Sequence, residues 1–504
     1  MMKPTLRTLV VVPYGVFLLS ACGAAPLPPA PVDPTPLPVA EPTVVVTPPA
    51  KPTVDPRVAA HEAKVAAALA RVPKIAERVS QIRKLPLKHP VPASIQGQED
   101  FKTFLAKEIA KDLPAAKSAN SVKALVRLGF LKESINLAQT VEDAMLSQAG
   151  AYYDPETKRF YIVLVPDDEM MLDVMSAHEL THALDDQYFD LAAYTEGPTH
   201  ALSNDVGLAR KMVAEGEATL VMLAFQAAAT AHMDIFDPKN RPIAQGMVAG
   251  FAELDSEALA KSAADSPDML KEMGPSVKAS IDAMSTIPPL ILDPLFGAYT
   301  KGASAVSTVQ QAGGWDAVSK LYTDPPESTE QLLHPMQKYV TKRDHPVELT
   351  FAPAPKMFAG LTPIDEDVIG EMTMAVYFRL WGKGLPAKPS SQVTGWGGDR
   401  YVAYDVGGRT VTVWLTTWDT VEDATRFAKA YDATLAVRFP GENHVVNAGS
   451  NKLRATVVHK DVTMLTVAQN GKDVAIIDGA ESKESLALLD WPAKATHTQA
   501  GSRH

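Results

Sequence analysis

The sequence predicts an α+β protein in which a mainly helical domain precedes a smaller domain with a mostly antiparallel sheet. Two patterns lead to this fold class. Apolar residues recur at helical spacing from residue 58 to about 128 and again from 191 to about 285. From about residue 345 the chain changes to short strand-like runs, separated by Gly407-Gly408 and Asn470-Gly471, which are typical of hairpin turns.

Length and composition bound the kind of protein. The chain has 504 residues and is 46% hydrophobic, which is enough to bury a large core. It carries 48 basic and 59 acidic residues, a formal net charge of −11. Since no basic cluster is interleaved with aromatic residues, nucleic acid is not expected as a partner.

The N-terminus has the pattern of a targeting segment. Lys3 and Arg7 precede an apolar run that is too short to span a bilayer comfortably and that ends in Leu-Ser-Ala-Cys-Gly around Cys22. This pattern resembles a bacterial lipoprotein signal, which implies that residues 1–21 are removed and that Cys22 is lipidated. A plain secretory signal with a stray cysteine is the alternative.

The resemblance also implies a location. The protein is expected in the cell envelope, attached to a membrane through its lipid anchor only, and Gly23 after the cysteine favours the outer membrane, facing the periplasm or the cell surface. The rest of residues 22–57 is proline-rich, so it should form an extended polyproline II spacer. A docking site for a proline-recognising partner is the alternative for this spacer.

Three further segments follow the spacer. Residues 58–340 are expected to form the helical domain, 345–484 the second domain, and 485–504 a disordered tail. A pro-segment role for residues 58–145 stays open.

A helical stretch contains His-Glu-Leu-Thr-His, from His178 to His182. The two histidines are four residues apart, so both imidazoles leave one face of the helix and can bind one ion. Glu179 is displaced by about 100° around the helix and can reach a metal-bound water rather than the metal. The spacing therefore predicts one Zn²⁺ per chain, held by His178 and His182, with Glu179 as the general base of a hydrolase.

Such a zinc site needs a third protein ligand and an open fourth position. Glu215 and Glu217 lie on a later helical stretch, two residues and about 200° apart, so only one of them can face the metal. H-E-x-x-H followed by E-G-E-A resembles the gluzincin metallopeptidases, in particular the HtpX and CAAX-processing type. The resemblance implies that Glu215 is the third ligand and that residues 58–340 form a zincin-like metallopeptidase domain.

One residue departs from the pattern of that family. Four residues after the ligand Glu, the family has an Asp that orients a metal-bound histidine, whereas this chain has Thr219. Thr219 could accept a weaker hydrogen bond, or Asp185, Asp186 or Asp205 could take over the role.

A strand-like run, Arg159 to Val165, directly precedes the H-E-x-x-H helix. In zincins an edge strand at this place binds the main chain of an extended peptide substrate by strand addition. We therefore expect residues 159–165 to lie at the edge of a sheet.

Several prolines and glycines interrupt residues 288–339, which predicts a broken region: Pro288, Pro289, Pro294, Gly302, Gly313 and Gly314. The segment that ends in His334-Pro335 loosely resembles the S/T-H-P segment of HtpX-like enzymes. That resemblance gives His334 a catalytic role, as a donor to the oxyanion of the tetrahedral intermediate, or gives His334 or Glu330 a place in the substrate groove. The alternative is a short capped helix with a packed histidine.

The second domain offers a hairpin around Gly407-Gly408, strand-like runs 453–459, 462–468 and 473–477, and helices 365–381 and 420–439. Its tryptophans could form an aromatic binding surface, but packing in the core is the expected role. These are Trp396, Trp414 and Trp418.

Two functions fit the sequence. The first is a zinc-dependent endopeptidase that hydrolyses peptide bonds of periplasmic or cell-surface proteins. The alternative is a non-catalytic lipoprotein whose zinc site is structural or degenerate and which acts as a binding or scaffolding module. Glu179 favours catalysis because a structural site has no use for this carboxylate, whereas Thr219 argues against it.

Overall fold

The architecture is taken from a computed structural model, which describes most of the chain after residue 55. The described residues are 10–13, 56–146, 149–163, 169–197, 202–254, 284, 286–449, 452–459 and 463–499. Cys22, most of the expected signal peptide and nearly all of the spacer lie outside them.

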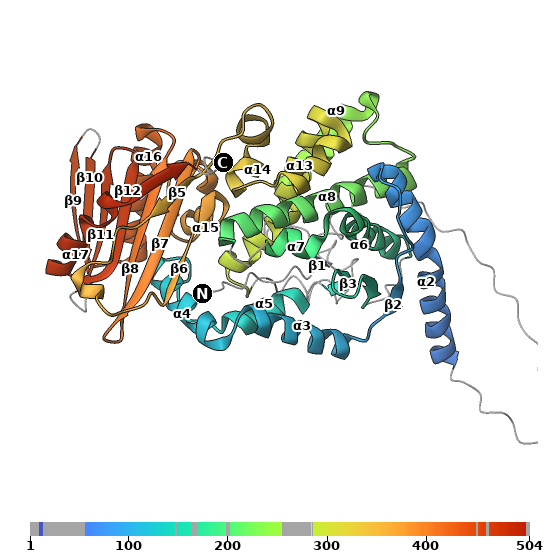
Figure 1. Ribbon diagram of the computed structural model, residues 1–504, viewed down its shortest axis with the longest axis horizontal. Coiled ribbons are helices and arrows are strands. Elements are labelled where there is room, and N and C mark those ends of the chain that lie inside the picture. Colours follow the sequence, from blue (N-terminus) through green and yellow to red (C-terminus); the bar gives the residue numbers. More distant parts are fainter. Residues whose placement is uncertain are drawn as a thin grey trace, which may run out of the picture.

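The protein is an α+β molecule whose helices and main sheet are segregated along its long axis (Figure 1). At one end a bundle of helices surrounds the central helices α6 and α8. The bundle consists of α2 (Pro56–Arg83), α3 (Gln98–Asp112), α4 (Ala115–Leu128), α5 (Leu137–Leu146), α6 (Glu169–Phe189), α7 (Leu191–Glu196), α8 (Asn204–Ala231), η2 (Pro238–Asn240), α9 (Arg241–Ala252), α13 (Pro289–Thr323), α14 (Thr329–Leu333) and η3 (Met336–Val340).

A small sheet packs against α6 in the order β1-β3-β4-β2. Its strands are β1 (Val10–Pro13), β2 (Ala93–Ile95), β3 (Ala149–Asp154) and β4 (Arg159–Ile162). The expected edge strand is therefore wrong in position, because β4 pairs with β3 on one side and with β2 on the other. The short β2 comes from the Pro-rich connector after α2, a pairing that the local sequence pattern does not reveal.

The opposite end of the molecule is a seven-stranded antiparallel sheet in the order β6-β7-β8-β12-β11-β10-β9 (Figure 1). The strands are β6 (Asp365–Asp367), β7 (Trp396–Val406), β8 (Arg409–Trp418), β9 (Asn443–Gly449), β10 (Lys452–Val458), β11 (Thr463–Asn470) and β12 (Asp473–Glu481). Helices α15 (Gly370–Trp381), α16 (Val421–Arg438) and α17 (Ser482–Leu489) accompany it, with the short turns η4 (Lys356–Phe358), η5 (Pro389–Gln392) and η6 (Pro492–Lys494).

The hairpin expected around Gly407-Gly408 is confirmed as β7 and β8, and both glycines have the positive φ that the turn needs. The helix expected over 420–439 is confirmed as α16, and Thr420 caps it by accepting a hydrogen bond from the backbone of Asp423. The segment 365–381 is only partly a helix, since β6 occupies its start.

The expected disordered tail is wrong for residues 485–499. After α17, β13 (Thr496–Gln499) pairs with β5 (Val347–Thr350) in a two-stranded sheet. Trp491 is buried, and its indole donates to the carbonyl of Ala352. The tail was expected to be disordered, but burial of Trp491 and pairing of β13 with the distant strand β5 keep this segment ordered.

The region 289–323 is helical on both sides of one break, so the expected interruption is confirmed at Gly314 and is wrong at Pro289 and Pro294. Pro289 lies in the first turn of α13, where a proline costs no hydrogen bond. The interruption is confined to Gly314, whose φ of 69° places a kink near the C-terminal end. The residues between Pro294 and Gly313 are therefore continuous helix.

Helices α8 and α13 approach closely because glycines face each other. A Cβ on Gly216 would collide with the backbone of Gly302, and a Cβ on Gly302 would collide with the carbonyl oxygen of Met212. Only hydrogen fits at these two positions, so this contact fixes the distance between the helices.

Helix α8 is long and apolar enough to cross a membrane by length and composition alone. However, 78% of its most apolar window is buried inside the fold. The apolar surface of α8 is thus accounted for by the core of the helical bundle.

The two ends of the molecule share side chains. Ala124 and Leu128 of α4 and the following Phe130 are buried in the core under the seven-stranded sheet. Within that core Asp399 of β7 accepts hydrogen bonds from the indoles of Trp396 and Trp414 and from the backbone of Ile369 and Gly370. The tryptophans Trp396, Trp414 and Trp418 are all buried, so the expected core role is confirmed.

We predict that Gly216→Ala destabilises the protein by about 1–3 kcal/mol, because the added methyl group forces α8 and α13 apart. Urea unfolding of the whole chain measures the effect. Gly246→Ala in α9 is the matched control, since nothing lies within 4 Å of the added Cβ. The control should be neutral or stabilised by about 0.5–1 kcal/mol. Equal effects of the two substitutions would contradict the packing argument.

Candidate metal centre

Helices α6 and α8 bring the three predicted ligands together. Nε2 of His178 lies 3.2 Å from Oε2 of Glu215, and Nε2 of His182 lies 3.5 Å from the same oxygen. The two imidazole centroids are 4.8 Å apart. All three side chains are completely buried. The cluster arises because His178 and His182 are four residues apart on α6 and because α8, which carries Glu215, packs against α6.

The protonation states suit a metal site. Burial lowers the pKa of His178 to about 4, so its imidazole is neutral at pH 7. Burial alone would raise the pKa of Glu215, but the two adjacent histidines outweigh it and lower that pKa to about 2. A carboxylate and neutral imidazoles are the forms that coordinate zinc.

The cluster also leaves polar atoms unsatisfied. Within the described part of the chain, Nδ1 of both histidines and Oε1 of Glu215 have no hydrogen-bond partner although they are buried. Buried polar atoms without partners are costly in a folded protein. Two imidazoles and a carboxylate whose donor atoms lie within 4.8 Å of one another fit a zinc ion.

The alternative ligand Glu217 has another role. It forms a buried ion pair with Arg83 of α2. The same arginine lies 3.8 Å from Asp185. Glu217 therefore faces α2, and of the two glutamates only Glu215 meets the histidines.

Asp185 is the best placed substitute for the Asp that the family pattern has at position 219. It follows His182 by three residues on α6, and the two side chains interact electrostatically. Burial raises the pKa of Asp185 to about 6, although Arg83 and His182 act in the opposite direction. The hydroxyl of Thr219 is buried and has no hydrogen-bond partner among the described residues.

The other two aspartates serve elsewhere. Asp186 accepts hydrogen bonds from the phenol of Tyr153 and from Lys158. Asp205 accepts hydrogen bonds from the backbone and the hydroxyl of Thr329, at 3.2 and 2.5 Å. Neither carboxylate has a contact with the metal ligands.

Glu179 is held by the main chain of the small sheet. The backbone N–H of Tyr153 in β3 donates to Oε2 of Glu179 over 2.8 Å. The side chain is completely buried, one residue along α6 from His178. The strand next to α6 thus fixes the carboxylate beside the cluster, as a general base requires.

Tyr299 of α13 completes the cluster, and sequence reasoning missed it. Its ring stacks on His178 with centroids 5.7 Å apart. Burial, the charges of Glu215 and Glu179 and a hydrogen bond to Glu215 raise the pKa of Tyr299 well above its ordinary value. The phenol is therefore a hydrogen-bond donor at any physiological pH. The prolines and glycines around Tyr299 had suggested a broken region, which hid it.

The structure does not bring His334 together with these residues. His334 ends α14, and its Nε2 lies 3.0 and 3.1 Å from the two carboxylate oxygens of Glu371 in α15. A hydrogen bond to Glu371 raises the pKa of His334 above its usual value. Glu330 is buried and lies 3.3 Å from Lys338. Ser328 caps α14, as the alternative interpretation expected.

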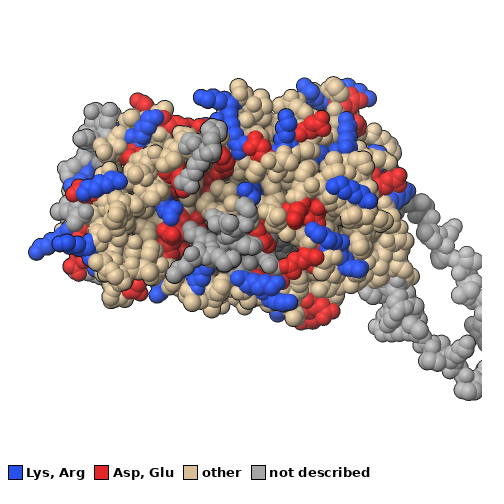
Figure 2. All heavy atoms as spheres, in the orientation of Figure 1, with Lys and Arg blue, Asp and Glu red and all other residues tan. Residues whose placement is uncertain are grey.

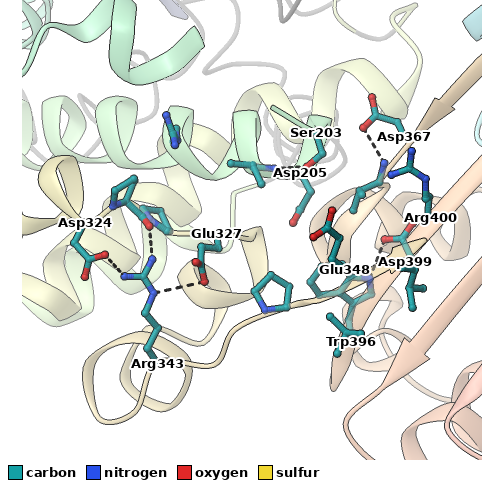
Figure 3. A pocket seen from close by; sticks show the side chains of 18 residues that line it. Ser203, Asp205, Asp324, Glu327, Arg343, Glu348, Asp367, Trp396, Asp399 and Arg400 are labelled. Carbon is teal, nitrogen blue, oxygen red and sulfur yellow. Dashed lines mark hydrogen bonds and ion pairs between the residues drawn. The ribbon is translucent and has the colours of Figure 1, made fainter. Parts of the chain in front are cut away.

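A separate pocket of about 510 Å³ lies between the helical bundle and the seven-stranded sheet (Figure 3). Its walls carry Asp205 from α8, Arg343 with its partners Asp324 and Glu327, and Arg400 from β7. None of the three metal ligands lines it. On the face of the molecule drawn in Figure 2, acidic and basic side chains are interspersed.

The comparisons with known proteins cover only part of the chain. A family described as a domain of unknown function, DUF8575, matches residues 358–489, which correspond to most of the second domain. Comparison with curated proteins and with solved structures finds no match. The metal cluster lies outside the matched residues.

We predict that Asp205 makes stability depend on pH. Burial raises its pKa to about 7, so between about pH 4 and 7 the folded chain keeps a proton that the unfolded chain loses. The free energy of unfolding should therefore fall as the pH rises through this window, by roughly 4 kcal/mol at most, and stay level above it. In Asp205→Asn this fall should be smaller by that amount but not absent, because burial also raises the pKa of Asp185. Urea titrations at pH 4 to 8 with a chelator test this, and parallel curves for both proteins would contradict it.

Proposed function

We propose that the protein is a zinc-dependent endopeptidase of the gluzincin type. The observation that carries the proposal is the buried cluster of His178, His182 and Glu215, with Glu179 one residue along the same helix. This set of residues has the composition of a hydrolytic zinc site. A zincin-like fold of the helical domain is part of the proposal, supported by the small sheet beside α6.

The residues divide the chemistry among them. Zinc, when bound, supplies a Lewis acid and a water of lowered pKa. Glu179 takes a proton from the attacking water as the new C–O bond forms, and delivers it to the leaving amine nitrogen as the C–N bond breaks. When Glu215 ligates zinc, the phenol of Tyr299 turns its hydrogen bond from Glu215 to the oxygen of the scissile carbonyl as that oxygen becomes negative. We assign this role to Tyr299 in place of His334.

The outer edge of β3 is the proposed binding site for the peptide main chain. In the full-length chain this edge pairs antiparallel with β1, with Val10 opposite Tyr153 and Val11 opposite Tyr152. An extended segment can therefore pair with β3 next to α6. Pairing of main chains binds a peptide largely independently of its side chains, which suits an endopeptidase.

The remaining parts of the proposal rest on the N-terminal sequence. Lipidation at Cys22 would tether the protein to a membrane of the cell envelope, with peptide or protein substrates in the periplasm or at the cell surface. The alternative, a scaffolding lipoprotein with a structural zinc site, has less support. Structural sites usually have four protein ligands, whereas the described residues supply three, and neither Glu179 nor Tyr299 would have a use.

We predict one zinc ion per chain in the purified protein. His178→Ala should lose the zinc, because two ligands hold it too weakly. Glu179→Gln should keep the zinc while peptide cleavage falls by about 10²–10⁴-fold, the usual contribution of a general base. Metal analysis and cleavage of a peptide library measure both, and His232→Ala, an exposed histidine at the end of α8, is the control. Cleavage by Glu179→Gln at the wild-type rate would refute the enzymatic function.

We predict that Tyr299→Phe lowers kcat by about 10²–10³-fold with little change in KM, since the donor acts on charge that develops only in the transition state. The zinc content should stay at one per chain. If Tyr299 only packed against His178, the ring of phenylalanine would preserve activity. Steady-state kinetics on a peptide cleaved by the wild type distinguish the two roles.

A further inference from the structure

Lys211 is a half-buried cation on the metal-binding face of α8. It precedes Glu215 by four residues, so the two side chains leave the same side of the helix, about 6 Å apart along its axis. Lys211 therefore borders the metal cluster without belonging to it.

No described residue satisfies this ammonium group. Lys211 donates no hydrogen bond and forms no ion pair within the described part of the chain, unlike Arg83 on the other side of the cluster. Burial lowers the pKa of Lys211, and the charge that opposes this effect is that of Glu215. A partly desolvated cation without a counterion is unfavourable, and proteins usually keep one only where something else supplies the negative charge.

Metal binding would leave this positive charge even less compensated. The two charges of a zinc ion balance the carboxylates of Glu215 and Glu179, while the histidines are neutral. The negative charge of Glu215 is then no longer available to Lys211. Within the described part of the chain no other carboxylate pairs with Lys211, and a substrate carboxylate is one group that can compensate its charge.

We propose that Lys211 binds a carboxylate of the peptide substrate within about two residues of the cleaved bond. The distance assumes a peptide that runs along α8, where 6 Å corresponds to about two extended residues at 3.3 Å each. The carboxylate is either the side chain of Asp or Glu or the free C-terminus of a short peptide. This inference rests on the proposed peptidase function and adds the substrate chemistry to it.

Binding to the zinc-loaded Glu179→Gln protein tests the inference without cleavage. The probes are three matched fluorescent peptide pools: neutral with an amidated C-terminus, neutral with a free C-terminus, and amidated with Asp or Glu at each position in turn. We expect one of the two carboxylate pools to bind more tightly than the neutral one. Adding Lys211→Gln should lower the binding affinity for that pool by roughly 10- to 100-fold and leave the affinity for the neutral pool unchanged.

Two further variants complete the test. Lys211→Arg should keep most of the preference because it keeps the charge, and the exposed Lys320→Gln of α13 should keep all of it. All variants should contain one zinc per chain, which separates substrate binding from damage to the metal site. The pool that responds identifies the source of the carboxylate.

The inference is overturned if Lys211→Gln lowers the binding affinity for all three pools equally, or if neither carboxylate pool binds more tightly than the neutral pool. A failure of the proposed function looks different. In that case the wild-type protein cleaves none of the pools, whereas the comparison of their binding still decides the role of Lys211.

Discussion

The contact between Gly216 and Gly302 is the constraint on which the metal cluster depends. It lets α8 and α13 approach until their backbones touch, one residue after Glu215 and three residues after Tyr299. Any side chain at either glycine would widen this crossing. The phenol would then withdraw from Glu215, and its ring from His178. The chemistry of the cluster is therefore set by two residues that carry no functional group.

A second consequence concerns the N-terminal helices. Arg83 of α2 neutralises Glu217 behind the cluster and lies near Asp185, which interacts with His182. Removing α2 would leave Glu217 as a buried charge without a partner, which is strongly destabilising. Helix α4 in turn belongs to the core under the seven-stranded sheet. The region 58–145 is thus built into both ends of the fold, which argues against its being a removable pro-segment.

The sequence predicted features that neighbouring residues determine. It missed features that depend on residues far apart in the chain. Three features depend on a few neighbouring residues, and the structure has all of them: the paired histidines His178 and His182, the hairpin at Gly407-Gly408 and the helix expected over 420–439. Identifying Glu215 as the third ligand required a family pattern as well, because nothing in the local sequence distinguishes it from Glu217. Tyr299, β2 and β13 depend on partners far away in the chain, and local composition was misleading for each of them. His334 was chosen from a loose resemblance, and its partner Glu371 lies in another element.

The position of α4 has a consequence for the matched domain family. The match covers residues 358–489 and so omits α4, β5 and β13. In this protein α4 and Phe130 bury part of one sheet face, and the pair β5–β13 covers apolar residues around Leu415 on the sheet. A chain that carried the matched segment alone would expose these surfaces to water. The segment defined by sequence similarity is therefore smaller than the folded unit to which it belongs in this protein.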